Sequence, residues 1–222
     1  MTESSFNGFS PDTYMFLMEL AFNNDKAFFS ANKERYNTYV KAPLTLMAQE
    51  LAPVMIEIDP DFNFRLTSVI SRIYRDTRFS KNKLPYRDHA WLCYKYPGER
   101  VSESFAMYFE IETKGYGYGM GMYNGNPEFM ARLRTHALAD PARFIALADE
   151  LKLKRYVLEG EMYKRDRFPN APEELKPYIN RKGLSWSYYD TQLKRTMQPE
   201  LLDEVKQAMR ELAPMYRFVM AK

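Results

Sequence analysis

The chain has almost none of the residues on which several classes of protein depend. Its 222 residues include one cysteine, Cys93, so a disulfide within the chain and a metal site built from several cysteines are both excluded. Only two histidines are present, His89 and His136. No stretch of about eighteen residues is continuously apolar, which excludes a membrane-spanning helix. Residues 1–8 lack the basic start and apolar core of a signal peptide, and we therefore expect a cytoplasmic protein.

An excess of one charge is also missing from the composition. The chain carries 32 Lys and Arg against 29 Asp and Glu, and the resulting formal net charge of +3 is too small to indicate a nucleic-acid partner. We expect no membrane partner either. The sequence does contain 45% apolar and 15% aromatic residues, enough to bury a sizeable core. We therefore expect one globular domain over residues 1–222, in which the proline-containing residues 164–177 form a loop.

Hydrophobic periodicity indicates helices at both ends of the chain and strands between them. Helices are expected to begin at Ser10-Pro11-Asp12, at Asp25, from which the helix runs as far as Val40, and after Pro43. Strands are expected over residues 66–74, 90–96, 105–112 and 116–122, with further helices after Asn126-Pro127, Asp140-Pro141 and Pro199. This order predicts an α+β fold, with a mainly antiparallel central sheet and helices before and after it.

Two alternating runs predict a β-hairpin. Apolar and polar side chains alternate along residues 105–112, and aromatic or Met residues alternate with glycine along residues 115–122. A two-residue turn, at Thr113-Lys114 or Lys114-Gly115, gives one sheet face the residues Tyr108, Glu110, Glu112, Gly117, Gly119 and Gly121, whereas a three-residue turn reverses the facing. Because glycine has no side chain, another backbone or a ligand can approach this strip closely. Two interpretations stay open: a helix packed on the strip, or the floor of a cleft walled by Glu110 and Tyr108.

The most informative stretch runs from residue 72 to residue 87. It contains six basic side chains and one acid, namely Arg72, Arg75, Arg78, Lys81, Lys83 and Arg87 against Asp76. Crowded like charges repel, so an anionic partner or acids elsewhere in the fold must offset them. Three interpretations stay open. The stretch forms an anion pocket, which suits the planar donors of arginine; it forms ion pairs with Asp76, Glu110, Glu112 or acids of the first helices; or it binds nucleic acid, with Tyr74, Phe79 and Tyr86 stacked on bases.

The same stretch, Arg-Ile-Tyr-Arg-Asp-Thr-Arg-Phe-Ser-Lys-Asn-Lys-Leu-Pro-Tyr-Arg, resembles the signature of a widespread, mostly bacterial family catalogued as domain of unknown function 2461. The resemblance covers most of residues 6–190. It extends to the pattern from Phe16-Leu17 to Tyr36, and to Gly119-Met-Gly121-Met-Tyr123 with the following helix that holds Arg132 and Arg134. The chain departs from the expected pattern at Phe28-Phe29, where many relatives have Trp-Phe, and at Asn82, where an Asp is common. The family carries no established activity, so the resemblance implies no mechanism.

From these patterns we expect a protein that binds a small anionic ligand, bearing phosphate or carboxylate, in a cleft between the Arg/Lys-rich loop 72–87 and the Gly-rich hairpin 105–123. The expected ligand-binding residues are Arg72, Arg75, Asp76, Arg78, Lys81, Lys83, Tyr86, Arg87, Tyr108 and Glu110. The alternative is a protein–protein interaction or structural module whose basic cluster is only ion-paired. The sequence specifies no cofactor and no oligomeric state.

Candidate catalytic groups are few, and the sequence leaves enzyme status open. Ser80 and Lys83 have the spacing of a nucleophile and its base, but the companion motifs are missing. The two histidines would have to meet with carboxylates to form a metal site, and we expect none. Asp76 or Glu110 is chemically suited to act as a general base, although neighbouring arginines lower a carboxyl pKa.

Overall fold

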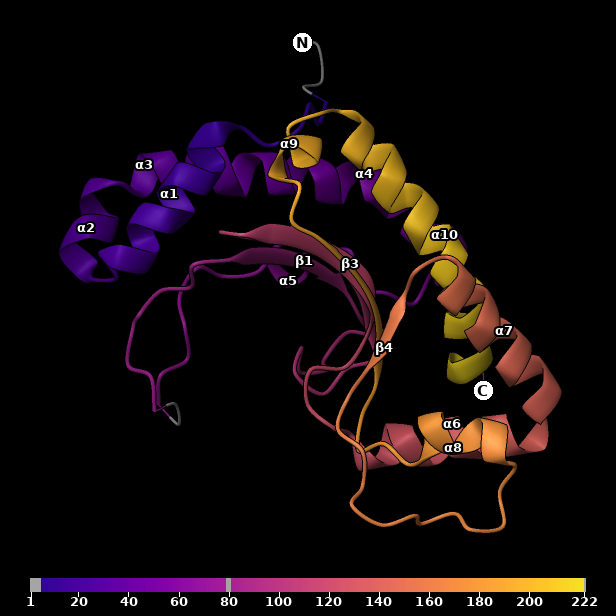
Figure 1. The fold of residues 1–222 in the computed structure, drawn as a ribbon. Helices are drawn as coiled ribbons and strands as arrows, with labels where there is room; N and C mark the ends of the chain where they lie inside the picture. The colour runs from indigo at the N-terminus through magenta and orange to yellow at the C-terminus, as the bar shows by residue number, and fades with distance from the viewer. Residues whose placement is uncertain (1–4, 79–80, 222) are drawn as a thin grey trace.

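The protein has an α+β fold, as the sequence predicts. Its computed structural model describes residues 5–78 and 81–221 (Figure 1). The strands are β1 Ala90–Tyr94, β2 Ala106–Glu112, β3 Gly115–Gly121, β4 Val157–Glu159 and β5 Ser185–Asp190. They form one five-stranded sheet in the order β1-β2-β3-β5-β4, and each neighbouring pair is antiparallel.

Helices precede and follow these strands in the chain. Before the sheet come α1 Pro11–Phe22, α2 Lys26–Ala31, α3 Lys33–Tyr36, the π-helical η1 Asn37–Lys41, α4 Ala42–Ile58 and the short α5 Leu66–Val69. Between and after the later strands come α6 Pro127–Ala139, α7 Pro141–Leu153, η2 Glu173–Leu175, α8 Lys176–Ile179, α9 Leu193–Thr196 and α10 Glu200–Met220. In the parts of the chain that the structure describes, no helix combines the length and apolar character needed to cross a membrane.

Two predicted elements differ in the structure. The single helix expected from Asp25 to Val40 is broken, because the Asn32 side chain donates to the carbonyl of Phe28 (2.9 Å) and ends α2. The expected cap is confirmed, since the Asp25 carboxylate accepts from the backbone N–H of Phe28 (2.8 Å). The loop expected over residues 164–177 gives way to η2 at Glu173.

The strand predicted over residues 66–74 is wrong. Residues 66–69 form α5, which follows a turn in which the Asn63 side chain accepts from the N–H of Arg65 (3.0 Å). Only single β-bridges follow, at Ile70 to Leu92 and at Tyr74 to Tyr86. The bridge between Tyr74 and Tyr86 explains the missing strand. After residue 71 the chain leaves the sheet and folds back on itself, so that Tyr74 pairs with Tyr86 instead of with β1. We call residues 71–89, of which the structure describes 71–78 and 81–89, the basic arm.

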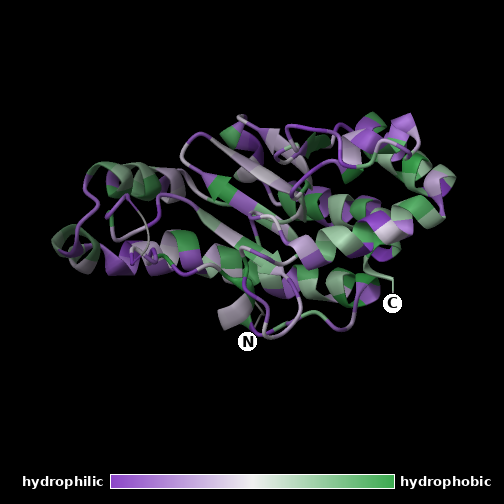
Figure 2. Ribbon diagram, turned by 90° about the horizontal axis from the view of Figure 1, so that it is seen from below, coloured by the Kyte–Doolittle hydropathy of each residue, from purple (hydrophilic) through white to green (hydrophobic). Residues whose placement is uncertain are grey.

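The sheet is curved, and its two faces differ. Figure 1 shows α4, α10 and α7 along the convex side, whereas the basic arm, the unlabelled purple loop that leaves β1, extends on the concave side. Side chains on the convex side, including Phe109 and Tyr116, are fully buried. The hydroxyl groups of Tyr116 and Tyr118 donate to Glu204 of α10 (3.2 and 3.0 Å). The alternation of green and purple along the helices in Figure 2 is that of amphipathic helices packed on a core.

The predicted hairpin is confirmed in turn and in facing. The turn is Thr113-Lys114, and the register pairs Glu112 with Gly115, Glu110 with Gly117 and Tyr108 with Gly119. Directly opposed residues of an antiparallel pair project from the same face. The glycine row therefore shares the concave face with Tyr108, Glu110 and Glu112.

Candidate functional site

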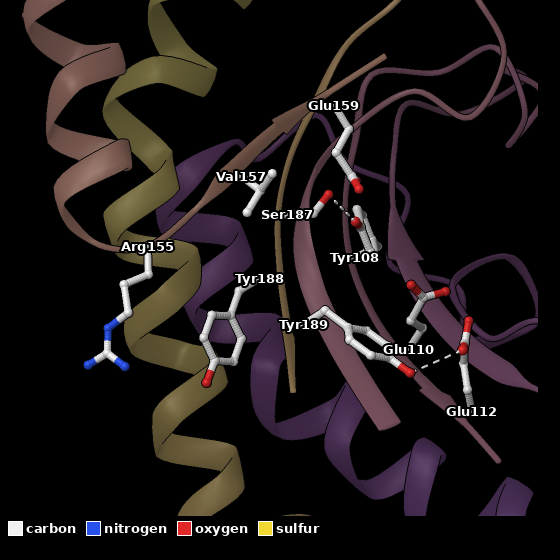
Figure 3. Close-up of a pocket in the computed structure, with 9 residues that line it drawn as sticks. All are labelled: Tyr108, Glu110, Glu112, Arg155, Val157, Glu159, Ser187, Tyr188 and Tyr189. Carbon is white, nitrogen blue, oxygen red and sulfur yellow. Dashed lines mark hydrogen bonds between the residues drawn. The ribbon is translucent and has the colours of Figure 1, made fainter. Parts of the chain in front are cut away.

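A pocket of about 430 Å³ lies on the concave face of the sheet. Strands β2, β4 and β5 and the turn before β4 supply its lining residues, which are Tyr108, Glu110, Glu112, Arg155, Val157, Glu159, Ser187, Tyr188 and Tyr189 (Figure 3). Strand β3 passes beneath the pocket and contributes glycine where its neighbours carry side chains. We call this cavity the carboxylate pocket.

The glycines of β3 let side chains from both neighbouring strands lie across it. Tyr108 of β2 and Ser187 of β5 share a hydrogen bond (2.8 Å) over Gly119, although β3 separates their strands. Tyr189 similarly donates to Glu112 (3.5 Å). A Cβ atom at Gly119 would stand 3.1 Å from the Tyr108 hydroxyl and overlap the backbone of β5. The strip is thus bridged by tyrosines, and the helices that contact β3 lie on its other face.

Glu110 is the most perturbed acid in the pocket. Burial, followed by the nearby charges of Glu112 and Glu159, raises its pKa to about 7. Among the described residues it has no hydrogen-bond or ion-pair partner, and the same is true of Glu159. Burial also raises the pKa of the Tyr108 hydroxyl, which therefore stays protonated. A carboxyl group that is half ionised near neutral pH can both accept and donate a proton.

The one arginine of the pocket does not neutralise its acids. In Figure 3, Arg155 and Tyr188 project to the left of β5, whereas Glu110 and Glu112 lie to its right. Tyr188 instead stacks on Tyr118 (ring centroids 4.9 Å apart). Strand β4 pairs only with residues 185–187 of β5. Arg155 and Tyr188 can therefore border the pocket beside the unpaired part of β5. The interior of the carboxylate pocket therefore presents hydrogen-bond acceptors and tyrosine hydroxyls.

Three of the predicted arginines gather at the base of the basic arm. The arm is a narrow antiparallel loop, with the N–H of Arg75 donating to Pro85 (2.9 Å) and the N–H of Arg87 to Ile73 (2.8 Å). This pairing gives Arg75 and Arg87 the same face. The Arg87 guanidinium donates to the carbonyl groups of Arg72 (2.8 Å) and Tyr74. Burial lowers the pKa of Arg87, and the charges of Arg75 and Arg72 lower it further.

The other predicted residues of the arm have different surroundings. Asp76 and Arg78 form an exposed ion pair (2.7 Å), and the hydrogen bonds from Arg78 lower the pKa of Asp76 to about 2. The Lys83 ammonium donates to the carbonyl of Thr77 (2.9 Å), and Lys81 is exposed. Tyr86 is buried and stacks on Phe29 (4.4 Å). Ion pairing thus accounts for Arg78, whereas no described acid forms a salt bridge with Arg72, Arg75 or Arg87.

Several proposed catalytic groups are not assembled. Ser80 and Phe79 lie outside the described residues. His89 stacks on Trp91 (5.4 Å), whereas His136 belongs to α6 and contacts the Phe218 carbonyl (3.2 Å). Within residues 5–78 and 81–221, no group of three or more His, Cys, Asp or Glu side chains is arranged to hold a metal ion.

Trp91 connects the basic arm to the carboxylate pocket. The Arg87 guanidinium lies over its ring, 4.8 Å from the centroid, and Trp91 is directly opposite Glu110 in the sheet. The described residues of the arm do not line the pocket. The basic arm and the carboxylate pocket, which were expected to form one cleft, are therefore two neighbouring regions of opposite charge. Sequence reasoning missed Glu159, Ser187 and Tyr189. Only the alternation in Ser185-Trp-Ser-Tyr-Tyr-Asp190 gives a signal for β5, and the sequence does not tell that it pairs with β3.

Comparison with known protein families shows what the chain is similar to. A family model described as "Conserved hypothetical protein (DUF2461)" matches residues 12–218. No curated protein matches the chain.

Proposed function

The chain belongs to this family of conserved hypothetical proteins, DUF2461, and from that premise we propose that it binds a small ligand through a phosphate or carboxylate group held by Arg72, Arg75 and Arg87. One observation carries the proposal, namely that the charges of Arg75 and Arg72 act on the Arg87 guanidinium at the base of the basic arm, while no described acid forms a salt bridge with any of the three. Like charges brought together in this way favour an anion between them. The ligand would lie on the concave face, between the basic arm and the glycine-rich hairpin.

The setting of Arg87 suits anion recognition. Two backbone carbonyls and the Trp91 ring hold its guanidinium in place, so little rotamer entropy remains to be lost when an anion binds. The Asp76 carboxylate forms its hydrogen bonds with Arg78, and its charge acts on Arg72 and Arg87 without a salt bridge to either. The proposal includes a cytoplasmic location, which fits a chain whose only cysteine is buried and unpaired.

Thermal-shift measurements at low ionic strength test the proposal. Inorganic phosphate, succinate and phosphorylated metabolites should raise the unfolding temperature saturably, because they bind only the folded arm. Arg75→Gln should abolish the shift, since the Arg75 side chain forms none of the arm's hydrogen bonds among the described residues and its loss leaves the fold intact. Arg165→Gln removes an exposed guanidinium outside the arm and is the matched control. Equal shifts in the two variants, or none in the wild type, would contradict the proposal.

A protein–protein interaction module is the second candidate, and one surface favours it. Met15, Met18 and Phe22 of α1 are 47%, 45% and 88% exposed, at a spacing that gives them the same side of the helix. Self-association through this surface predicts a dimer in light scattering that Phe22→Ser converts to monomer. A strict monomer in both proteins argues against it.

A further inference from the structure

The carboxylate pocket has more hydrogen-bond acceptors than the protein itself satisfies. Glu110 and Glu159 have no partner among the described residues, and Glu112 receives only the long bond from Tyr189. Arg155, the only basic residue of the lining, projects away from them in Figure 3. Glu110 and Glu112 are half-buried and Glu159 is exposed, so a ligand with donor groups can reach all three carboxyl groups and gain charge-assisted hydrogen bonds from them.

The walls of the pocket suit an organic cation. Its volume of about 430 Å³ lies within the range of small-molecule sites, roughly 300–1,000 Å³. The rings of Tyr108 and Tyr189 lie over the glycine strip beside Glu110, and aromatic faces attract ammonium and guanidinium groups. The acids are not arranged as a metal site within the described residues.

An anion site of opposite character lies next to this pocket. The Arg87 guanidinium is 4.8 Å from the Trp91 ring centroid. Trp91 is opposite Glu110, and opposed side chains in a sheet are about 5 Å apart at Cβ, so the two charged regions are neighbours on the same face with the Trp91 side chain between them. The path between them runs along the concave face over one indole ring.

We propose that the ligand is bipolar: one end bears the phosphate or carboxylate that the arginines of the basic arm bind, and the other end bears an ammonium or guanidinium group that enters the carboxylate pocket and pairs with Glu110 and Glu159. This inference rests on the proposed function, because it names the class of ligand for the same concave face. It adds a second recognition element that neither the basic stretch nor the glycine row alone indicates.

The pocket also sets a pH dependence for the cationic end. The groups facing Glu110 are Glu112 on its own strand, Glu159 of β4, and the hydroxyls of Tyr108 and Tyr189, and the tyrosines stay protonated near neutral pH. Because burial, followed by the charges of Glu112 and Glu159, raises the pKa of Glu110 to about 7, its carboxyl group is mostly uncharged below pH 7 and mostly ionised above it. Affinity for the cationic end should therefore rise with pH through about 7.

Calorimetric titration with three series of compounds tests the inference. We would compare straight-chain ω-aminocarboxylates, α,ω-dicarboxylates and α,ω-diamines of matched chain length at pH 8 and low salt. At one chain length, the aminocarboxylate should bind about tenfold tighter than either symmetrical compound, since it gains a charge-assisted hydrogen bond at each end. Glu110→Gln should remove its advantage over the dicarboxylate and leave dicarboxylate binding in place. Glu128→Gln, an exposed acid of α6, is the matched control and should change nothing.

The other outcomes separate this inference from the proposed function. If dicarboxylates bind as tightly as aminocarboxylates in both the wild type and Glu110→Gln, the bipolar ligand is wrong and anion binding stands. If only diamines bind, and Glu110→Gln abolishes this, both proposals are overturned because the arginines play no part. If no compound binds and the anion screen also gives no shift, both proposals are overturned.

Discussion

At the scale of single residues, two carboxyl groups show how the surroundings determine acid strength in this protein. Glu110 lies in the carboxylate pocket beside two other acids, and its pKa rises to about 7. Asp76 lies on the exposed basic arm, where hydrogen bonds from Arg78 lower its pKa to about 2. The sequence places Asp76 among the basic residues of the arm, and only the structure shows that Trp91 lies between Arg87 of the arm and Glu110.

We expect Glu110→Gln to stabilise the protein at alkaline pH. The pKa in the folded state, about 7, lies above the ordinary value of 4.5, so the unfolded chain loses this proton first as the pH rises. Glu110 therefore costs the folded protein no stability below pH 4.5. The free energy of unfolding falls between pH 4.5 and 7, and above pH 7 it is lower by about 3 kcal/mol at most. Urea unfolding at pH values from 4 to 9 should show wild-type and variant curves that separate above pH 5. Curves that stay parallel, as expected for Glu128→Gln, would show that Glu110 is not perturbed.

At the scale of elements, the sequence predicts what is local and misses what is paired over long distances. The alternation along residues 105–122 and a two-residue turn were enough to predict the hairpin, its facing and the glycine strip. The strand over residues 66–74 was predicted wrongly because its apolar residues belong to α5 and the arm, and its pairing with β1 is limited to Ile70 and Ser71. Most of the pocket lining was missed because β4 and β5 come much later in the chain, and the sequence does not show that β5 lies between β3 and β4 in the sheet.

Gly119→Ala should destabilise the protein more than Gly117→Ala. An added Cβ atom at Gly119 would overlap the Trp186 carbonyl in the neighbouring strand, and backbone cannot move aside as a side chain can. At Gly117 the nearest atom is 3.0 Å away, a contact that a shift of a few tenths of an ångström relieves. We expect a loss of about 3 kcal/mol or more for Gly119→Ala and about 1 kcal/mol for Gly117→Ala, measured by denaturant unfolding. The reverse order would mean that β3 and β5 are further apart than the register requires.

Asn24 should control how firmly the basic arm is held. Its side chain donates to the carbonyl of Tyr86 (3.0 Å) and accepts from the N–H of the same residue (2.9 Å). Asn24→Ala should speed hydrogen exchange at Tyr86, Arg75 and Arg87, whose amides bond within or to the arm. The neighbouring Asn23→Ala is the control, because among the described residues the Asn23 side chain bonds only to the Glu19 carbonyl of α1. Unchanged exchange in Asn24→Ala would show that the Phe29 stacking alone fixes the arm.

At the scale of the whole molecule, α10 joins parts of the chain that lie far apart in sequence. It packs on α4, α6, α7 and β3. Tyr216 of α10 and Tyr96, which follows β1, both donate to Asp59 at the end of α4 (3.1 and 2.7 Å). One buried cluster includes residues from Phe6 to Val219. These links join the described parts of the chain from end to end, and a single domain over residues 1–222 stays a prediction.

We therefore expect one cooperative unfolding transition, detected at the same midpoint by far-UV circular dichroism and by tryptophan fluorescence. Leu212→Ala in α10 should lower the free energy of unfolding by about 2–5 kcal/mol, since Leu212 is fully buried, and should shift both signals together. Leu153→Ala removes a leucine that is 84% exposed and should have little effect. Two separate transitions in either probe would divide the chain into independent units.

The position of the single cysteine has a practical consequence for chemical labelling. Cys93 lies opposite Tyr108 in the sheet and is buried, and burial raises the pKa of its thiol to about 12. Only the thiolate reacts with alkylating reagents, so the folded protein should resist them at neutral pH. Alkylation under native conditions then requires β1 to open, and its rate measures how often that part of the sheet opens. A second cysteine introduced on the basic arm could carry a fluorophore with no competing reaction at Cys93.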